Sequence, residues 1–599
     1  MRRSLTINSA AASRTLCLAA ALLAAAIALS QAASATMDSV RMAMEQEMER
    51  TMNQLSLPGL KSPCFVGYTV SDALTLQCTA SLGAVVASDV EPQRRARVRL
   101  LVGTKELSNE NYMYSGSWTA GDDIPLDDSR RGIRQVLWKL SDAKYKEHAE
   151  DYEKKLSAMA QQNLAPEDTA LPDLSQEPIL SFEQESEPVS WQAYHWEELA
   201  RRLSAIFKEY PSIQGSQVSI YLYQANVRYL NSEGTWAKYP FAISAVVAEC
   251  AAQAEDGREL SDRLEFYARA PQELASEESM AQGIRRMAET LTRLAQAPLI
   301  EESYAGPVLF EDQALAELLT AKFFQGDAGL KAKRKNILDP SLAGSRIRQA
   351  LDNPLEARLG KKVISRELSV SDLPGLSSYE GQSLIGSFAI DAEGVRPPEE
   401  LVLVERGVLR NLLNGRTPTQ RIRQSNGHKR LELTANGLAE EIGPSVVRVE
   451  GHKSMAYRKL KEKLIKAARS EDLDYAYLIR KVGRAWGGSV RDGEGSLPTP
   501  VEVIRVSVKD GSETLVRGAE ISGLSLSALK RVLAISRERY VHNTMIGAQG
   551  SGQGWGWGLR GVPVSLIIPK ALLLEEVELV RERKAVTTKL PPVPNPLRP

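Results

Sequence analysis

The sequence predicts an α+β fold, in which an N-terminal α/β domain at residues 36–300 precedes a β-rich C-terminal domain at residues 301–590. Helical and strand-like patterns alternate in the first part, whereas short apolar segments and Gly-rich turns dominate after Pro307. The 599 residues are 43% hydrophobic and 25% charged, which is typical of globular proteins with two to four domains.

Residues 1–35 are predicted to be a secretory signal peptide. Arg2, Arg3 and Arg14 are basic, residues 16–29 are apolar, and residues 33–35 read Ala-Ser-Ala, as at a cleavage site. The apolar run is short and Ala-rich for a membrane span, so a retained anchor is the less favoured alternative. We therefore expect an exported mature chain, periplasmic or extracellular, that begins at Thr36 and has no stable membrane anchor.

The charge balance argues against nucleic acid as a partner. Lys and Arg together number 75, as do Asp and Glu, and removal of the three leader arginines leaves a net charge of about −3. A nucleic-acid-binding protein usually carries a basic surface, so neither nucleic acid nor an anionic membrane is an expected partner.

The N-terminal domain begins with a predicted amphipathic helix at residues 38–55, where Val40, Met44, Met48 and Met52 recur every four residues. Residues 161–189 are rich in Pro, Glu and Asp, lack periodicity and are predicted to be a flexible linker. Further helices are predicted at residues 133–156, 196–210 and 276–294. Strands are predicted at residues 65–70, 74–78, 82–87, 95–102, 218–223, 227–230 and 240–250.

The mature chain has three cysteines: Cys64, Cys78 and Cys250. Three widely spaced thiols do not make a zinc cluster. Cys64 and Cys78 flank a segment that is predicted to be a hairpin turning at residues 71–73. Across such a hairpin, the two residues either form a disulfide in an oxidising compartment or remain buried thiols.

The C-terminal domain is predicted to contain a helix at residues 312–323 and a longer helix at residues 453–468. Its strands are predicted at residues 384–391, 400–405, 408–412, 446–450, 501–509, 514–521, 562–568 and 573–580. The final residues 591–599 form a Pro-rich tail, which is expected to be extended.

Four sequence blocks, at residues 384–413, 416–431, 513–533 and 552–569, resemble the TldD/PmbA family of metallopeptidases. They include an I-D-x-E-G turn at residues 390–394, S-N-G-H-x-R at residues 425–430 and V-P-V at residues 562–564. The order and spacing of the blocks carry the resemblance more than any single block. It implies a C-terminal domain of the TldD/PmbA type and a peptidase function.

The resemblance also implies that the family's zinc site is missing. Zinc-binding members carry H-E-x-x-x-H where this chain has Phe310 and Leu315 at the two histidine positions, and only Glu311 remains. A third ligand, a cysteine before V-P-V, falls near Trp555. Because zinc needs three or four N, S or O donors, no metal is predicted in this chain. Glu311 is a weak candidate for a catalytic residue; the favoured alternative is a solvated residue at a helix N-terminus.

Two loops are candidate peptide-binding segments. One contains Ser425, Asn426, Gly427, His428 and Arg430, whose arginine and backbone N–H groups could hold a carboxylate or carbonyl. The alternative is a loop with a structural role only.

Trp555 and Trp557, flanked by glycines, form the second loop, and they either clamp a peptide or fill a cavity. His148 and His195 each lie near carboxylates on or beside predicted helices. A metal pair there is the alternative to solvated helix faces.

By resemblance, the chain is predicted to be the zinc-free subunit of a peptidase pair acting on peptides or unfolded proteins, and to be inactive alone. Its partner would be a metal-bearing TldD-like subunit, with a self-dimer as the alternative. Two other functions remain open: an active metallopeptidase with non-standard ligands, and a peptide-binding scaffold without catalysis.

Overall fold

The computed structural model describes residues 38–113, 121–161, 170–185, 195–325, 329–338, 353, 355–483, 499–547 and 559–581. The predicted signal peptide, the Pro-rich tail, Trp555 and Trp557 lie outside these residues. No helix in the described ranges is long and apolar enough to cross a membrane.

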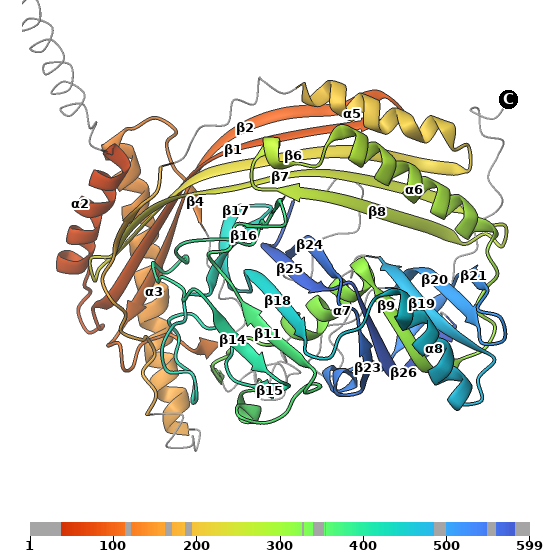
Figure 1. Ribbon diagram of the computed structural model, residues 1–599. Helices are drawn as coiled ribbons and strands as arrows, with labels where there is room; N and C mark the ends of the chain where they lie inside the picture. Colours follow the sequence, from red (N-terminus) through yellow and green to blue (C-terminus); the bar gives the residue numbers. More distant parts are fainter. Residues whose placement is uncertain are drawn as a thin grey trace, which may run out of the picture.

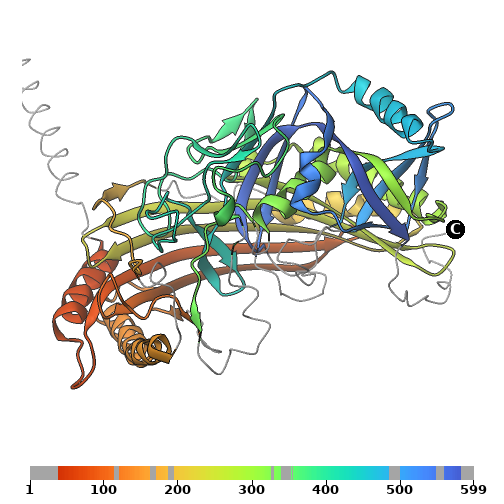
Figure 2. The ribbon, with the colours of Figure 1, turned by 90° about the horizontal axis from the view of Figure 1, so that it is seen from below.

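A long curved sheet forms the upper layer of the molecule (Figure 1), and Figure 2 shows its strands running along most of the molecule's length. The strand order is β4-β2-β1-β6-β7-β5, and β8 pairs with β7. The strands are β1 Pro63–Ser81, β2 Ala84–Val102, β4 Asp122–Asp123, β5 Ser181–Glu183, β6 Ile213–Asn231, β7 Trp236–Gln253 and β8 Glu259–Ala268. Neighbouring long strands are antiparallel.

Two pairs of helices pack on this sheet at opposite ends (Figure 1). The helices are α2 Ser39–Gln54, α3 Arg130–Gln161, α5 Trp196–Ala205 and α6 Glu277–Gln296. The Asp38 side chain caps α2 by accepting hydrogen bonds from the N–H groups of Val40 and Arg41, which are otherwise unpaired at a helix start. Met44 and Met48 of α2 are buried against α3 and the sheet.

The C-terminal half contains two more large sheets, with strand orders β15-β14-β11-β18-β25-β24 and β21-β20-β19-β9-β26-β22; β23 also pairs with β26. The strands are β9 Tyr304–Glu311, β11 Leu368–Asp372, β14 Leu401–Glu405, β15 Val408–Leu409, β18 Val446–Gly451, β19 Tyr475–Val482, β20 Pro500–Ser507, β21 Glu513–Val516, β22 Ala519–Ser522, β23 Val532–Ile535, β24 Arg539–Ile546, β25 Val562–Pro569 and β26 Ala571–Arg581. A separate hairpin consists of β16 Lys429–Thr434 and β17 Gly437–Ile442.

Helix α7, Asp312–Phe324, packs against β19 and β9 of one C-terminal sheet and β24 of the other, and most of its residues are buried. Helix α8, Arg458–Ser470, covers the outer side of β9 and buries Leu460 and Leu464. The predicted α+β class is confirmed, and the boundary predicted near residue 300 falls between α6 and β9.

The hairpin predicted between Cys64 and Cys78 is wrong. Strand β1 continues through Ser71 and Asp72, because the Asp72 carboxylate forms ion pairs with Arg94 of β2 and Arg228 of β6. The turn comes only after Ser81. The two cysteines are therefore 14 positions apart on one strand, about 46 Å at 3.3 Å per residue, and both are free thiols.

Several other predictions differ from the structure, among them the strand predicted at residues 514–521, which is divided into β21 and β22. Residues 218–230 belong to one strand, β6, whose turn follows Asn231. Within the predicted linker, residues 170–185 are packed rather than flexible: Leu171 and Leu174 are buried, and Asp173 forms an ion pair with Lys155. Residues 384–391 form an irregular loop instead of a strand.

Candidate functional site

The segment Phe310 to Leu315 connects β9 to α7 inside the C-terminal core. Phe310 and Leu315 are both 0% exposed and belong to the same apolar cluster. Phe310 lies opposite Ile479 of β19 and Leu572 of β26, so β9 is a central strand of its sheet. The two apolar side chains are therefore part of the packing that holds α7 in place.

The Glu311 carboxylate is 1% exposed, so the prediction of a solvated residue at the helix N-terminus is wrong. The Tyr457 hydroxyl donates to its Oε1 at 2.7 Å, and Arg480 Nε donates to its Oε2 at 3.1 Å. Burial raises the pKa of Glu311, although both hydrogen bonds lower it. Both oxygens of the carboxylate thus have partners from the protein itself.

The predicted binding loop at residues 425–430 is ordered by internal hydrogen bonds. His428 is 0% exposed; its Nε2 lies 3.3 Å from Asp372 Oδ1, and its Nδ1 lies 2.8 Å from the Asn426 carbonyl oxygen. The Gly427 backbone has φ +70°, and a Cβ there would lie 2.8 Å from Pro397 Cα, so this position requires glycine. The His428 side chain of this candidate peptide-binding loop is therefore enclosed by the protein itself.

The remaining loop residues have mixed roles. Asn426 donates to the Leu412 carbonyl and accepts from the Asn414 N–H, and Ser425 Oγ accepts from the Gly427 N–H. These contacts fix the loop. Arg430, by contrast, forms part of a cavity wall.

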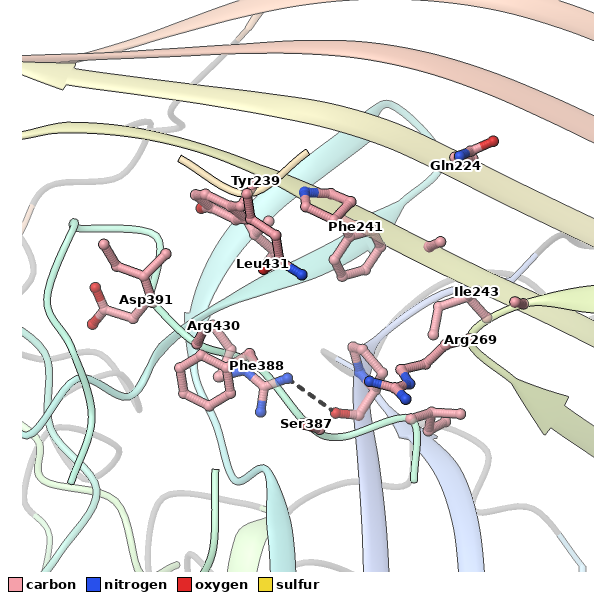
Figure 3. Close-up of a pocket in the computed structure, with 18 of the residues that line it drawn as sticks. Gln224, Tyr239, Phe241, Ile243, Arg269, Ser387, Phe388, Asp391, Arg430 and Leu431 are labelled. Carbon is pink, nitrogen blue, oxygen red and sulfur yellow. Dashed lines mark hydrogen bonds between the residues drawn. The ribbon is translucent and has the colours of Figure 1, made fainter. Parts of the chain in front are cut away.

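This cavity, of about 690 Å³, lies between β7 of the long sheet and the C-terminal half. Tyr239 and Phe241 line one side, and Phe388 and Arg430 line the other (Figure 3). Ligand-binding pockets are typically mostly apolar, with a few polar groups that fix orientation. The cavity therefore has the size of a typical binding site, and its lining combines aromatic with charged side chains.

Several polar groups face this cavity. Arg430 Nη1 donates to the Pro444 carbonyl at 2.7 Å, its guanidinium carbon lies 4.1 Å from the Phe388 ring centre, and burial lowers its pKa to about 10. The Tyr239 hydroxyl is buried and has no hydrogen-bond partner among the described residues. An unpaired buried hydroxyl costs free energy, which a hydrogen bond to a bound group would recover.

The Asp391 carboxylate lies at one end of the cavity and shapes the I-D-x-E-G turn. It accepts hydrogen bonds from the N–H groups of Glu393, Val395 and Lys429. Burial, together with the nearby Glu393 carboxylate, raises its pKa well above the ordinary value. This turn holds the loop that forms the C-terminal wall.

The cavity could not be located from the sequence, because its lining comes from segments between residues 182 and 563. One signal was present. Tyr239 and Phe241 are two positions apart on β7, so both aromatic rings project from the same face of the strand.

The carboxylates near His148 lie on α3. Glu147, His148 and Asp151 each offer a ligand atom within 4.8 Å of the others. Burial lowers the pKa of His148 and raises that of Asp151 to about 6. His195, by contrast, is exposed at the start of α5.

Residues 303–579 match the family model described as the PmbA/TldA metallopeptidase C-terminal domain. The C-terminal half of the chain belongs to the TldD/PmbA family. Two curated metalloproteases are also similar, one from Methanothermobacter thermautotrophicus (39% identical over 92 residues) and one from Methanocaldococcus jannaschii (34% over 131 residues). The matched stretches cover 13% and 20% of this chain, and only 19% and 26% of the two relatives.

Solved structures of TldD/PmbA type share the fold over most of the chain. TldE from Thermococcus kodakarensis has a TM-score of 0.54 and 12% identity, covering 90% of this chain and 100% of its own. A proposed modulator of a DNA gyrase from Thermotoga maritima has the same TM-score and coverage, with 16% identity. At such identities the similarity establishes the fold and nothing further.

The residues present do not fit the zinc of TldD/PmbA metallopeptidases. Phe310 and Leu315 have no donor atom, and the Glu311 carboxylate is held by Tyr457 and Arg480. His542 Nε2 lies 3.1 Å from Glu317 Oε1, but these two side chains alone do not supply the three protein ligands that a zinc site needs. Trp555, the third position in question, lies outside the described residues.

Proposed function

We propose that this chain is an exported, zinc-free member of the TldD/PmbA family that binds peptides and acts beside a metal-bearing partner. The observation that carries the proposal is the conversion of the H-E-x-x-x-H segment into core packing, with Phe310 and Leu315 fully buried. A chain that keeps the fold but lacks these donors serves a peptidase by binding substrate.

The cavity beside β7 supports the peptide-binding part of the proposal. Its aromatic lining suits apolar side chains, while Arg430 and the unpaired Tyr239 hydroxyl offer hydrogen bonds to carbonyl or carboxylate oxygens. Peptides and unfolded segments present both kinds of group. The same cavity would serve a scaffold that binds peptides without any peptidase partner, so this is the second candidate function.

An active metallopeptidase with displaced ligands has less support. In the described part of the chain, the group of three potential ligands that lie close together is on α3, not near Glu311. The proposed function therefore assigns hydrolysis to the partner.

Affinity purification of the tagged chain from its native host tests the pairing. We expect a partner carrying H-E-x-x-x-H to copurify, and the pair, but not the isolated chain, to cleave unfolded protein. Recovery of the chain only with itself, together with peptide binding, would favour the scaffold. Recovery of neither a partner nor bound peptide would contradict both candidates.

Export is tested separately by N-terminal sequencing of the secreted or periplasmic chain. The proposal expects a mature N-terminus at Thr36 and no uncleaved protein in the membrane fraction. Retention of residues 1–35 in the membrane would contradict it.

A further inference from the structure

Three potential metal ligands lie on one face of α3, at the end of the molecule opposite α5 and α6 (Figure 1). Glu147 and Asp151 are four residues apart, and His148 and Asp151 are three apart, so Asp151 is a neighbour of both on the helix surface. Their ligand atoms already lie within 4.8 Å of one another. The helix itself therefore sets the spacing of the group.

Asp151 is buried among charged side chains. The residue is 6% exposed, the charges of Lys154 and Glu147 act on its carboxylate, and among the described residues no hydrogen bond or ion pair holds it. Buried carboxylates in proteins are normally hydrogen-bonded, ion-paired or bound to a metal. A cation bound between Asp151, Glu147 and His148 would neutralise the Asp151 carboxylate.

The ring of His148 is held in place by strand β2. Its Nδ1 lies 2.6 Å from the Leu100 carbonyl oxygen of β2. Because a carbonyl oxygen only accepts hydrogen bonds, Nδ1 carries the proton and the lone pair of Nε2 is left available. Metal-bound histidines usually donate their other ring N–H to an oxygen in this way.

Glu147 connects the group to solvent. Its side chain is 31% exposed, which leaves a path for an ion, and its Oε2 accepts a hydrogen bond from Lys144 Nζ at 2.8 Å. The Lys144 ammonium therefore neutralises Glu147 in this structure and would compete with a bound cation.

We propose that Glu147, His148 and Asp151 bind one divalent transition-metal ion such as Zn²⁺, with water completing its coordination. One imidazole nitrogen and two carboxylates are a donor set that suits Zn²⁺ better than Mg²⁺ or Ca²⁺, which prefer oxygen ligands alone. The ion would tie α3 to β2 through His148. This site is independent of the missing family zinc.

Titration of the purified mature chain with Zn²⁺, and with Co²⁺ as a spectroscopic probe, tests the site. We expect one strong equivalent, with Co²⁺ giving visible absorption from a nitrogen–oxygen ligand set. Asp151→Asn and His148→Gln should each weaken binding by about tenfold or more, since loss of even an outer partner of a metal ligand costs 10–100-fold. Lys144→Met should strengthen binding, because the competing ammonium is gone.

Glu150→Gln is the matched control. Glu150 lies on the same helix but is 67% exposed and paired with Lys154, so its loss removes one negative charge and no ligand. It should leave the affinity nearly unchanged. Circular dichroism of each variant shows whether α3 still folds. If Glu150→Gln weakens binding as much as Asp151→Asn, or if neither Asp151→Asn nor His148→Gln changes it in folded protein, the site is refuted.

Discussion

Glu311 is the one residue of the H-E-x-x-x-H motif that this chain retains, and its neighbours give it a structural role. Tyr457 and Arg480 donate to its two oxygens, and Glu311 itself is 1% exposed. The same residue type therefore stabilises the junction between β9 and α7 here, although the family resemblance implied a role beside a metal.

The buried Glu311 predicts a pH-dependent difference between the wild type and Glu311→Gln. Burial raises the folded-state pKa above the ordinary 4.5, so the stabilising contribution of Glu311 is fully present below its unfolded pKa and is lost as the pH rises through the folded pKa. The glutamine side chain of the variant does not titrate. The difference between the free energies of unfolding of the wild type and the variant, measured in urea, should therefore favour the stability of the wild type more at pH 4 than at pH 7. An increase in the stability of the wild type relative to the variant as the pH rises would contradict a raised pKa of Glu311.

Tyr239→Phe is predicted to separate stability from peptide binding. Removing a buried hydroxyl that lacks a partner should leave the free energy of unfolding unchanged or raise it by up to about 1–3 kcal/mol. Affinity for an unstructured peptide should fall about 2–10-fold, as expected for one lost hydrogen bond.

Tyr223→Phe is the control for this prediction. The Tyr223 hydroxyl is also buried without a partner among the described residues, but Tyr223 is not part of the cavity wall. It should change stability in the same direction and leave peptide binding unaltered. Equal effects of the two variants on binding would argue against the cavity as the peptide site.

At the scale of single elements, β1 changes the interpretation of the cysteines. The strand runs unbroken from Pro63 to Ser81, so Cys64 and Cys78 cannot meet. We expect the mature chain, denatured without reductant, to show three reactive thiols in a thiol titration. Fewer than three, with faster migration on a non-reducing gel, would indicate an intramolecular disulfide and contradict this strand.

The sequence predicts several helices more accurately than it predicts the long strands. The helices at residues 39–54 and 277–296 begin at side-chain caps, Asp38 and Ser276, and their predicted bounds differ from the structure by two residues or fewer. The helix at residues 312–324 has no such cap, but its predicted bounds are equally close. The long strands were divided because Ser71 and Asp72 look like turn residues. Their place within a strand depends on Arg94 and Arg228, which are distant in sequence.

At the scale of the whole molecule, buried ion pairs connect the long sheet to the C-terminal half. Arg416 is 1% exposed; its Nη1 donates to Glu233 at 2.6 Å and its Nη2 to the Ser175 carbonyl at 2.6 Å. The residues of the cavity wall are distant in sequence, and these contacts between the two halves bring them together. For that reason the position of the cavity could not be predicted from local patterns.

Arg416→Met should destabilise the chain toward the lower end of the 3–5 kcal/mol that a broken buried pair costs, because Lys105 still pairs with Glu233. Urea unfolding followed by tryptophan fluorescence measures this loss. Arg531→Met, which removes an exposed pair with Glu576, should cost no more than about 1 kcal/mol. Similar losses for the two variants would show that Arg416 does not hold the halves together.

The absence of the family zinc from this fold is tested most directly by metal analysis of the purified mature His148→Gln/Asp151→Asn variant, in which the proposed α3 site is removed. We expect no stoichiometric zinc and no chelator-sensitive peptidase activity. One tightly bound zinc per chain, with peptidase activity that is lost on chelation and restored by zinc, would contradict it.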